Sequence, residues 1–569
     1  MVESKNVSIE LITDSKVSQQ LVGLSFEENS LYYSINMEGP KDRTPVLIKR
    51  SDGGYSLIIK NVEMGNYIKD GRAYDIVTKN KIDVFSYATY FTMTGNEGTM
   101  KIASDEATAL HDAFPVDALT AYNDMPLARY KRFSQKFKIT LKPSGNENDA
   151  VKVYEADMKY VAKRFSDVPA KDKEIALKVL KELTHTTEEE QKLIEKYMNS
   201  EYIDQFDMLN STMKELGFKY LLADTNLSIH TLTAYPYSEL EDGKYFALYD
   251  GKKVLMFSPV ELNKPFLKFV CEYDNFEKAM KELTSEEKIG VEGNSVPIGR
   301  VNAIGFDRVA DATLCLSLWR ARYAHQTLAY YVINVIATRW AMENALKYAE
   351  ETMNAGKKIT ERDVEAKYID LLREFSVKFG CPDLLLKKYF VVLHAGARSP
   401  YPALSSDYVL NKDMNTLKLD SGIHLFRDDI LFSGTDLCRM LLLDDKGKQV
   451  YEMLSENIRK DVIPNIKDGM TGEDVYWLGA KPLSEKAQWL KDIDMLAKDF
   501  DLKNNYARDI GHTQEKEEST TIRVEKGSKA KWENLMLGCI EYQWPYKFYA
   551  IGIEDIFFLT PEKSINITH

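Results

Sequence analysis

Five side chains in the C-terminal third of the chain have types and positions that suit metal binding. Each stands beside a short β-type run, such as residues 417–419 or 556–558. The first of these runs is expected to end at Asp420, in a turn that includes Gly422. Four are carboxylates, and burying four carboxylates together is unfavourable unless cations neutralise them. If these side chains converge, a metal must therefore be present. The five residues are Asp420, Asp436, His512, Glu541 and Glu554.

Oxygen-rich ligation with one imidazole indicates which metals to expect. Such a donor set suits manganese, iron, cobalt or zinc better than a purely thiophilic metal. A carboxylate-bridged pair of ions about 3.5–4 Å apart is the usual arrangement for activating water. We therefore predict two divalent ions, manganese first, with iron, cobalt or zinc as alternatives. Taken singly, each residue is as readily explained as a turn, cap or surface residue.

The order of the five residues resembles the pita-bread metallopeptidase family, which includes creatinase, prolidase, aminopeptidase P and methionine aminopeptidase. The similarity spans about residues 300–560. The motifs that carry it are Asp420-Ser421-Gly422 for Asp-x-Gly, Thr435-Asp436-Leu437-Cys438-Arg439 for Ser/Thr-Asp-x-Thr-Arg, Gly511-His512 for Gly-His, Gly538-Cys539-Ile540-Glu541 for Gly-Met-x-x-x-Glu, and Ile553-Glu554-Asp555 for Arg-Ile-Glu-Asp.

This resemblance implies a dinuclear metal-dependent hydrolase like aminopeptidase P. A metal-bridging hydroxide would attack a C–N bond of a peptide or amide, and Glu541 would both ligate metal and shuttle the proton. The substrate would be a small peptide or another small molecule. An alternative keeps the metals but changes the reaction, to a metal-dependent lyase or small-molecule hydrolase. A third hypothesis is a non-catalytic binding module, against which the intact ligand set speaks.

Two departures from the family pattern leave alternatives open. The gap between the first two ligands is 16 residues (436 − 420), longer than the family usually has, and it contains Asp428 and Asp429. Either could replace Asp436 as a ligand. We favour Asp436 because Cys438 and Arg439 keep the family's small-residue-then-Arg pattern.

The second departure is the absence of two accessory histidines that the family's peptidases place beside the metals. Ala403 stands at the first position and the Ser519 region at the second. Losing one transition-state donor typically costs about 2.7–4 kcal/mol, so a replacement or a different chemistry is implied. The candidate replacements that contact substrate are His394 and His424, and further possible donors are Arg398, Tyr401 and Tyr542.

The elements that position these residues predict an α/β (α+β) chain in three domains. We expect an N-terminal α/β domain over 1–165, a charged helical connector over 166–200 and a second α/β domain over 201–300. The domains over 1–165 and 201–300 resemble creatinase N-terminal modules. We expect a pita-bread catalytic domain over 301–569. Thr187 and Glu190 predict a capping box in the connector. By resemblance to three-domain aminopeptidase P, the protein is expected to form a homodimer.

A weak internal sequence repeat predicts that the catalytic domain has two similar α/β halves around one site. Thr360 is followed three residues later by Asp363, and Thr471 by Asp474, with a glycine shortly before each threonine. Both threonines can cap a helix whose third residue is acidic. The two copies are 111 residues apart (471 − 360).

Composition excludes several other classes of protein. The 569 residues carry a formal net charge of −12 without a basic cluster, which argues against nucleic-acid binding. We read neither a secretory leader nor a run of roughly 20 apolar residues that could span a membrane. The five cysteines form no CxxC pair, which argues against a disulfide framework and favours a reducing, cytoplasmic location.

Overall fold

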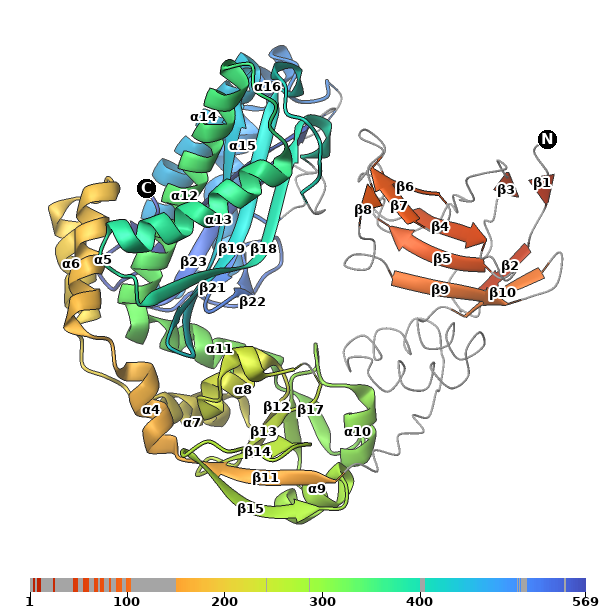
Figure 1. Cartoon of the computed structure of the whole chain (residues 1–569), viewed down its shortest axis with the longest axis vertical. Coiled ribbons are helices and arrows are strands. Elements are labelled where there is room, and N and C mark those ends of the chain that lie inside the picture. Colours follow the sequence, from red (N-terminus) through yellow and green to blue (C-terminus); the bar gives the residue numbers. More distant parts are fainter. Residues whose placement is uncertain are drawn as a thin grey trace. The chain divides into compact units, whose positions relative to one another are not determined.

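The computed structural model describes residues 150–569, apart from 242, 286, 400–404, 499, 501, 503–508 and 547–548, together with short strands before residue 104. The chain divides into two compact units (Figure 1). One comprises Met1–Met158, Leu216–Tyr235 and Glu239–Thr313, and the other Lys159–Glu215, Pro236–Ser238 and Leu314–His569. All five predicted metal ligands belong to the second unit. Among the described helices, none has the length and apolar character needed to cross a membrane.

The described part of the N-terminal 149 residues consists of short strands in three small sheets. The largest has the order β2-β10-β9-β5-β4. The rest of the predicted first domain lies outside the described residues. The strands are β1 (Ser4–Lys5), β2 (Ser8–Leu11), β3 (Leu24–Ser25), β4 (Thr44–Lys49), β5 (Tyr55–Lys60), β6 (Asn66–Lys69), β7 (Arg72–Asp75), β8 (Lys81–Ile82), β9 (Thr89–Thr94) and β10 (Thr99–Ala103).

A seven-stranded sheet with the order β15-β11-β14-β13-β12-β16-β17 organises the remainder of the first unit. Its core packs Val153, Leu222 and Phe257 against Phe276 of helix α9. β11 falls within the range predicted for the first domain but pairs with β14 and β15. The domain limits stay a prediction. The elements are β11 (Val151–Ala156), β12 (Tyr220–Ala223), α8 (Asn226–Thr233), β13 (Phe246–Tyr249), β14 (Val254–Ser258), β15 (Leu267–Tyr273), α9 (Phe276–Thr284), β16 (Ile289–Val291), α10 (Ile298–Ile304) and β17 (Val309–Asp311).

Helices form the start of the second unit, as expected for the charged connector. The capping box of Thr187 and Glu190 is present at the start of α6. Helix α7 buries Phe206, Leu209 and Met213 along one face. The helices are α4 (Met158–Ser166), α5 (Ala170–Leu183), α6 (Glu188–Met198), α7 (Gln205–Leu216) and α11 (Thr313–Tyr323).

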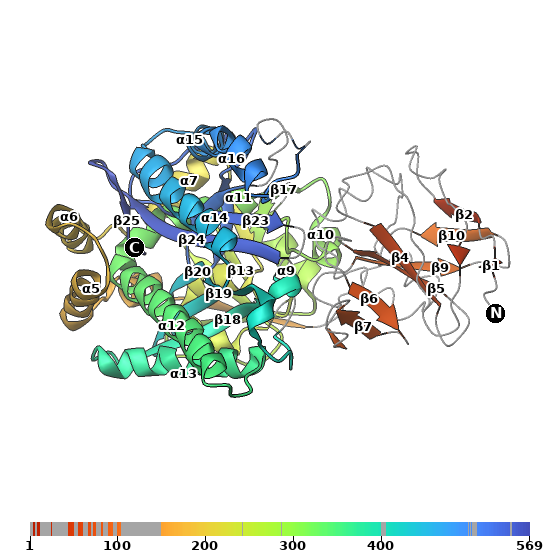
Figure 2. The ribbon, with the colours of Figure 1, turned by 90° about the horizontal axis from the view of Figure 1, so that it is seen from above.

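The first half of the C-terminal region is a three-stranded antiparallel sheet covered by two helices. The strands β18 (Leu384–Ala395), β19 (Thr416–Arg427) and β20 (Ile430–Leu442) pair in that order. Helices α12 (Leu328–Asn354) and α13 (Glu361–Lys378) lie against them (Figures 1 and 2). Tyr368 Oη donates to Ser421 Oγ at 3.2 Å, so the helices cover the face with odd-numbered residues of β19. The even-numbered face therefore remains for the site.

The second half repeats this plan with a five-stranded sheet of order β22-β21-β23-β24-β25. Its core gathers Trp532, Ile540, Tyr542 and Phe557. The elements are α14 (Asp445–Glu456), α15 (Gly472–Glu485), α16 (Ala487–Asp492), β21 (Gly511–Gln514), β22 (Glu518–Arg523), β23 (Leu537–Tyr546), β24 (Tyr549–Leu559) and β25 (Ser564–Asn566).

The internal sequence repeat corresponds to a structural repeat. Thr360 and Thr471 both form complete capping boxes, at the start of α13 and α15. Each threonine also forms an isolated antiparallel bridge, to Val409 in the first half and to Lys531 in the second. The predicted α/β class and its two similar halves are thus confirmed, and they agree with the pita-bread plan that the resemblance implied.

One expectation about local structure is wrong. The sequence predicts that the strand from Leu417 ends in a turn directly after Asp420, but β19 continues to Arg427. The turn comes at Asp428 and Asp429, where Asp428 has a φ of 52°. The long gap between the first two ligands is therefore a longer hairpin, which keeps Asp420 and Asp436 in register.

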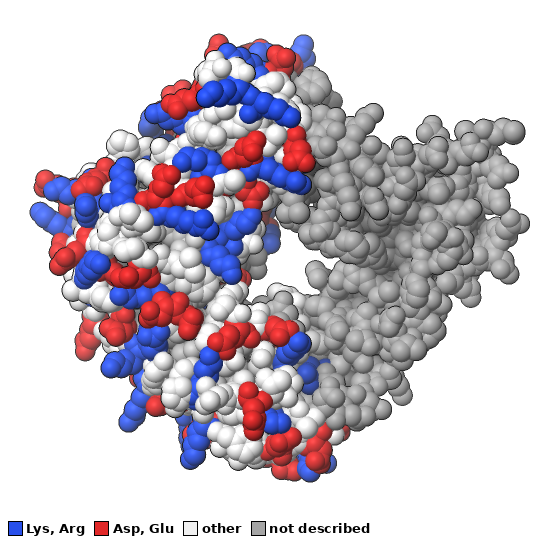
Figure 3. Space-filling model, viewed as in Figure 1, with Lys and Arg blue, Asp and Glu red and all other residues white. Residues whose placement is uncertain are grey.

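The surface of the described residues carries mixed charges. On the face shown in Figure 3, Lys and Arg side chains alternate with Asp and Glu side chains. Among the described residues of this face, basic and acidic side chains are thus interspersed.

Candidate metal centre

The hairpin of β19 and β20 brings the first two predicted ligands onto one face. Asp436 stands opposite Gly422, and Asp420 stands opposite Cys438 two register positions away. Residues directly opposite each other in an antiparallel pair point to the same side, and so do residues two apart on one strand. Both carboxylates therefore leave the even-numbered face, away from α12 and α13.

The five-stranded sheet contributes the other three predicted ligands in the same manner. His512 of β21 stands opposite Cys539 of β23, and Glu541 of β23 stands opposite Glu554 of β24. Strand β24 packs against β19 and β20. The two sheets therefore bring their ligand-bearing faces together, and every one of the five predicted residues lies within a strand.

Donor atoms from these strands form two overlapping groups. Within each group, the possible ligand atoms all lie within 4.8 Å of one another. One group is Asp420, Asp436 and Glu554, and the other is His512, Cys539 and Glu554. His512 Nε2 lies 4.0 Å from Asp436 Oδ2, which links the groups. Glu554 belongs to both and is 2% exposed. Glu541 lies beside them as the cross-strand partner of Glu554.

Electrostatics at Glu554 indicate a need for positive charge. Burial raises the pKa of this carboxyl well above its usual range, and the charges of Asp436, Glu541 and Asp420 raise it further. Its Oε1 atom is buried without a hydrogen-bond partner. Lys418 Nζ, 3.9 Å from Asp420 Oδ2, brings one positive charge to a cluster of four carboxylates.

The donor set fits divalent cations. Carboxylate oxygens, an imidazole nitrogen and the orphaned Oε1 are suitable ligands, and cations would remove the mutual repulsion. His512 Nδ1 lies 2.9 Å from the carbonyl oxygen of Thr513, which can only accept, so Nδ1 carries the proton. The Nε2 lone pair is left facing the cluster, as in histidines that bind metals.

A buried ion network fixes the strand that carries Glu554. Arg439 and Arg459 bind opposite oxygens of Asp555, at 2.6 and 2.7 Å. Although burial opposes ionisation, these two guanidinium groups hold the pKa of Asp555 well below its usual range. The arginine of the predicted Thr-Asp-x-x-Arg motif thus anchors β20 to β24, immediately beside two ligands.

Asp428 and Asp429, the alternatives to Asp436, lie away from the cluster. Both are exposed in the hairpin turn, and Asp428 faces Arg164 at 3.6 Å. The structure thus brings Asp436 rather than either of them to the other predicted ligands.

His424 lies on the ligand-bearing face of β19. It stands opposite Gly434, two register positions beyond the pair Gly422 and Asp436. Its Nε2 lies 3.2 Å from Glu517 Oε1, close enough for an ion pair although not aligned as a hydrogen bond. Its ring stacks on Tyr389, with ring centroids 4.3 Å apart. This position beside the donor groups suits a residue that contacts substrate.

Glu517 reaches His424 because its segment passes directly over Gly434. The Gly434 amide donates to the carbonyl of Glu515, and a Cβ atom at Gly434 would lie 2.0 Å from the carbonyl oxygen of Lys516. Tyr237 Oη also donates to Glu517, at 2.7 Å. Burial opposes ionisation of Glu517, yet His424 and Tyr237 lower its pKa.

His394 has different surroundings from His424. It is fully buried, with Nδ1 3.7 Å from Glu361 Oε2, and Glu361 also binds Arg398 and Ser406. Arg398, one of the possible donors, is engaged in this network. Tyr542, another, donates to Asn457. Ala403 and Tyr401 lie outside the described residues.

Glu361→Gln should lower the free energy of unfolding by about 3–5 kcal/mol, because the buried charge of Arg398 would lose its carboxylate partner. Urea denaturation at pH 7 measures this loss. Glu350→Gln, at an exposed position on α12, is the matched control. A loss no larger than that of the control would mean that the ion pair contributes little.

Stability should also fall in weak acid because of His394. Burial lowers the pKa of His394 below its ordinary value of 6.5. As the pH falls below that value, the unfolded chain takes up a proton before the folded chain does, so folding becomes less favourable. His394→Gln should therefore flatten the decline in unfolding free energy between about pH 7 and 5. An unchanged slope in urea titrations would contradict this.

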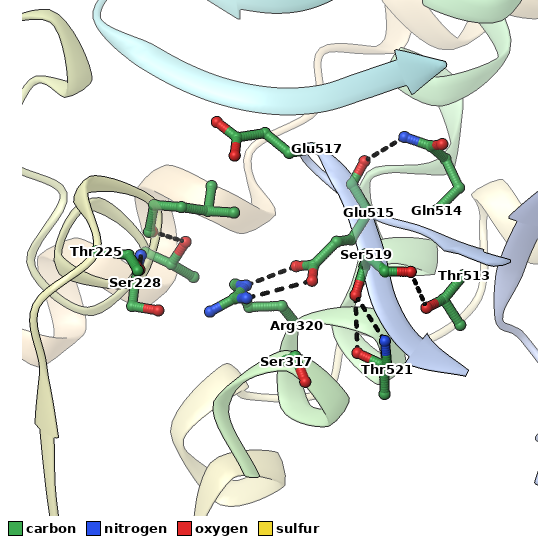
Figure 4. A network of polar contacts seen from close by, with 12 residues as sticks. Thr225, Ser228, Ser317, Arg320, Thr513, Gln514, Glu515, Glu517, Ser519 and Thr521 are labelled. Carbon is green, nitrogen blue, oxygen red and sulfur yellow. Dashed lines mark hydrogen bonds and ion pairs between the residues drawn. The ribbon is translucent and has the colours of Figure 1, made fainter. Parts of the chain in front are cut away.

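Ser519, which stands near the second accessory histidine position, is occupied by local contacts. Its hydroxyl lies 2.7 Å from Thr521 Oγ1, and its carbonyl accepts from Thr513 (Figure 4). Nearby, Arg320 forms a buried ion pair with Glu515 at 2.6 Å. Ser519 therefore lies in a structural network next to β21.

Cys539 and Glu517 were not predicted from the sequence. Cys539 could have been recognised by alternation, because it is two residues before Glu541 on the same strand and so shares its face. Glu517 carries no such signal, since its role depends on a loop crossing Gly434.

With this geometry established, the chain can be compared with known proteins. No family model matches it, and no curated protein does. The chain is similar to solved prolidases. That of Pyrococcus horikoshii OT3 is 17% identical, with 64% of this chain and 98% of that chain covered and a TM-score of 0.47. That of Pyrococcus furiosus is 16% identical, with coverages of 63% and 99% and a TM-score of 0.46.

An X-prolyl aminopeptidase from Caenorhabditis elegans is a further similar structure. It is 15% identical, with 64% of this chain and 61% of that chain covered and a TM-score of 0.47. It is described as a cytosolic enzyme with a di-nuclear active site.

Proposed function

We propose that the chain is a dinuclear metal-dependent hydrolase of the pita-bread type, which cleaves the C–N bond of a small peptide or amide. The observation that supports this most strongly is the convergence of Asp420, Asp436 and Glu554 with His512 and Cys539, beside Glu541. Surface carboxylates are common without metal, but Glu554 is buried among other carboxylates and keeps an orphaned oxygen.

In this proposal Asp420, Asp436, His512, Glu541 and Glu554 hold the ions, with Glu554 shared because it belongs to both donor groups. Bound divalent ions supply Lewis acidity towards a carbonyl oxygen and lower the pKa of water towards about 7. Manganese is our first choice of metal. The all-oxygen group of Asp420, Asp436 and Glu554 suits that ion.

Glu541 is proposed to move the proton. Unlike Glu554, it is only partly buried, and it stands directly opposite Glu554 at the edge of the donor groups. A carboxylate here can accept a proton from the attacking water and return it to the leaving nitrogen. His424, held by Tyr389 and Glu517, is proposed to contact the substrate, whereas His394 supports β18 through Glu361.

A second candidate is a small-molecule hydrolase or lyase with the same metals. Ser519 near the second accessory position favours it, because its hydroxyl is bonded to Thr521 rather than left for substrate. Without a replacement, the missing donor would cost about 2.7–4 kcal/mol of transition-state stabilisation for ordinary peptides.

The decisive experiment loads the metal-free protein with Mn²⁺, Co²⁺ or Zn²⁺ and assays Xaa-Pro peptides beside a panel of small amides and lyase substrates. We expect metal-dependent cleavage in the peptide arm. Turnover confined to the small molecules would favour the second candidate. Failure to bind any of the three ions would overturn both and leave a non-catalytic binding module.

We also propose a homodimer, on the resemblance alone. Light scattering of the full chain during gel filtration tests it, and the mass of a single chain over a wide concentration range would contradict it.

A further inference from the structure

We propose that Cys539 is a metal ligand, and that His512, Cys539 and Glu554 form a thiolate-containing subsite that selects zinc over manganese. This inference rests on the proposed function, because it specifies one of the two ion positions. It adds a sulfur donor to a set that the sequence motifs describe as oxygen and nitrogen only.

Strand register places the thiol against the imidazole. Cys539 and His512 are direct partners in the antiparallel pairing of β23 and β21. Cys539 Sγ lies 3.3 Å from His512 Nε2, and both lie within 4.8 Å of a Glu554 oxygen. Cys539 is 0% exposed, so this thiol faces the donor groups and not solvent.

A simple hydrogen bond between thiol and imidazole explains only part of this arrangement. It would satisfy Sγ and Nε2, because Nδ1 already donates to the Thr513 carbonyl. The thiol also interacts with Glu554, but its single proton cannot serve both Nε2 and the carboxylate, and Glu554 Oε1 stays buried without a hydrogen-bond partner. A cation between the three atoms accounts for the lone pair of Nε2, the sulfur and the orphaned oxygen together.

The chemistry of the donors predicts different preferences for the two positions. Sulfur and imidazole ligands with a carboxylate are typical of zinc, whereas manganese prefers oxygen ligands. The group of Asp420, Asp436 and Glu554 is all oxygen. On binding, the Cys539 S–H bond breaks, the proton leaves to water and the sulfur bonds to the ion, so binding releases a proton.

Cobalt(II) reports a thiolate ligand directly, through a sulfur-to-metal charge-transfer band in the near ultraviolet. We expect metal-free protein to develop this band on titration with Co²⁺. Cys539→Ser should lose the band and weaken zinc binding at least about tenfold, as changes even outside the ligand shell do. Cys315→Ser, which changes another fully buried thiol on α11, should keep the charge-transfer band and the zinc affinity.

Cys438→Ser is a second control, because Cys438 stands opposite Asp420 and is also buried. A band that survives in Cys539→Ser, or that disappears in Cys438→Ser instead, would overturn the inference while leaving the metal-dependent hydrolase in place. Failure to bind cobalt, manganese or zinc would overturn the proposed function as well.

X-ray absorption at the zinc edge of the unmodified protein needs no variant, so it remains decisive if Cys539→Ser does not fold. We expect a sulfur scatterer at about 2.3 Å from zinc. A first shell of oxygen and nitrogen alone would overturn the assignment of Cys539.

Discussion

Glu541→Gln should abolish turnover while the chain still folds. Glutamine keeps the shape of the side chain but cannot accept the proton from water, and general acid–base catalysis contributes typically about 10²–10⁴-fold to a rate. We therefore expect kcat to fall at least about a hundredfold, on whichever substrate the unmodified protein cleaves. Steady-state kinetics with the metal-loaded protein measures this.

Two controls separate a lost proton carrier from a lost fold. Glu350→Gln, at an exposed position of α12, should keep full activity. Circular dichroism should be the same for Glu541→Gln as for the unmodified chain. The kinetics are measured at metal concentrations that saturate each protein, because glutamine is a weaker metal ligand than a carboxylate. Undiminished turnover in Glu541→Gln would refute the role assigned to this carboxylate.

Glu554→Gln should have opposite effects on stability with and without metal. In the metal-free protein, burial and the charges of Asp436, Glu541 and Asp420 raise the pKa of Glu554 well above its usual range, so folding costs the free energy of protonating this carboxyl. Glutamine is neutral and removes this cost, so unfolding should become less favourable. With metal, the variant should lose the shared ligand. The unmodified chain should gain about 2.7 kcal/mol at a free ion concentration one hundred times its dissociation constant, and the variant should gain much less.

Thermal unfolding with a chelator and with excess Zn²⁺ or Mn²⁺ tests this pair of effects. Asp428→Asn is the matched control, because it neutralises a carboxylate that is 70% exposed in the hairpin turn. The control should respond to metal like the unmodified chain. An equal metal response in Glu554→Gln would show that the ions bind elsewhere.

The sequence indicates which predicted ligands share a strand face, because this depends on short-range order. Each of Asp420, Asp436, His512, Glu541 and Glu554 lies in a motif of a few residues, and alternation along a strand then fixes the face of each side chain. The capping threonines Thr360 and Thr471 also act locally, so the two halves could be inferred from their spacing.

Features that depend on tertiary contacts could not be predicted. The extent of β19 beyond Asp420 is set by pairing with β20, and Gly422, a turn signal in the sequence, instead lies mid-strand opposite Asp436. Similarly, the approach of Glu517 to His424 depends on a loop that crosses Gly434. The sequence also carried no sign that His394 and His424 have different surroundings.

The division of the ligands between the two repeated halves has a consequence for how the protein matures. Asp420 and Asp436 come from the β19–β20 hairpin, whereas His512, Glu541 and Glu554 come from the five-stranded sheet. Neither half alone holds a complete donor set. Under the proposed function, a chain with one half still unfolded could not bind the ions and would have no activity. Once both halves had folded, the bound ions would stabilise the interface between them.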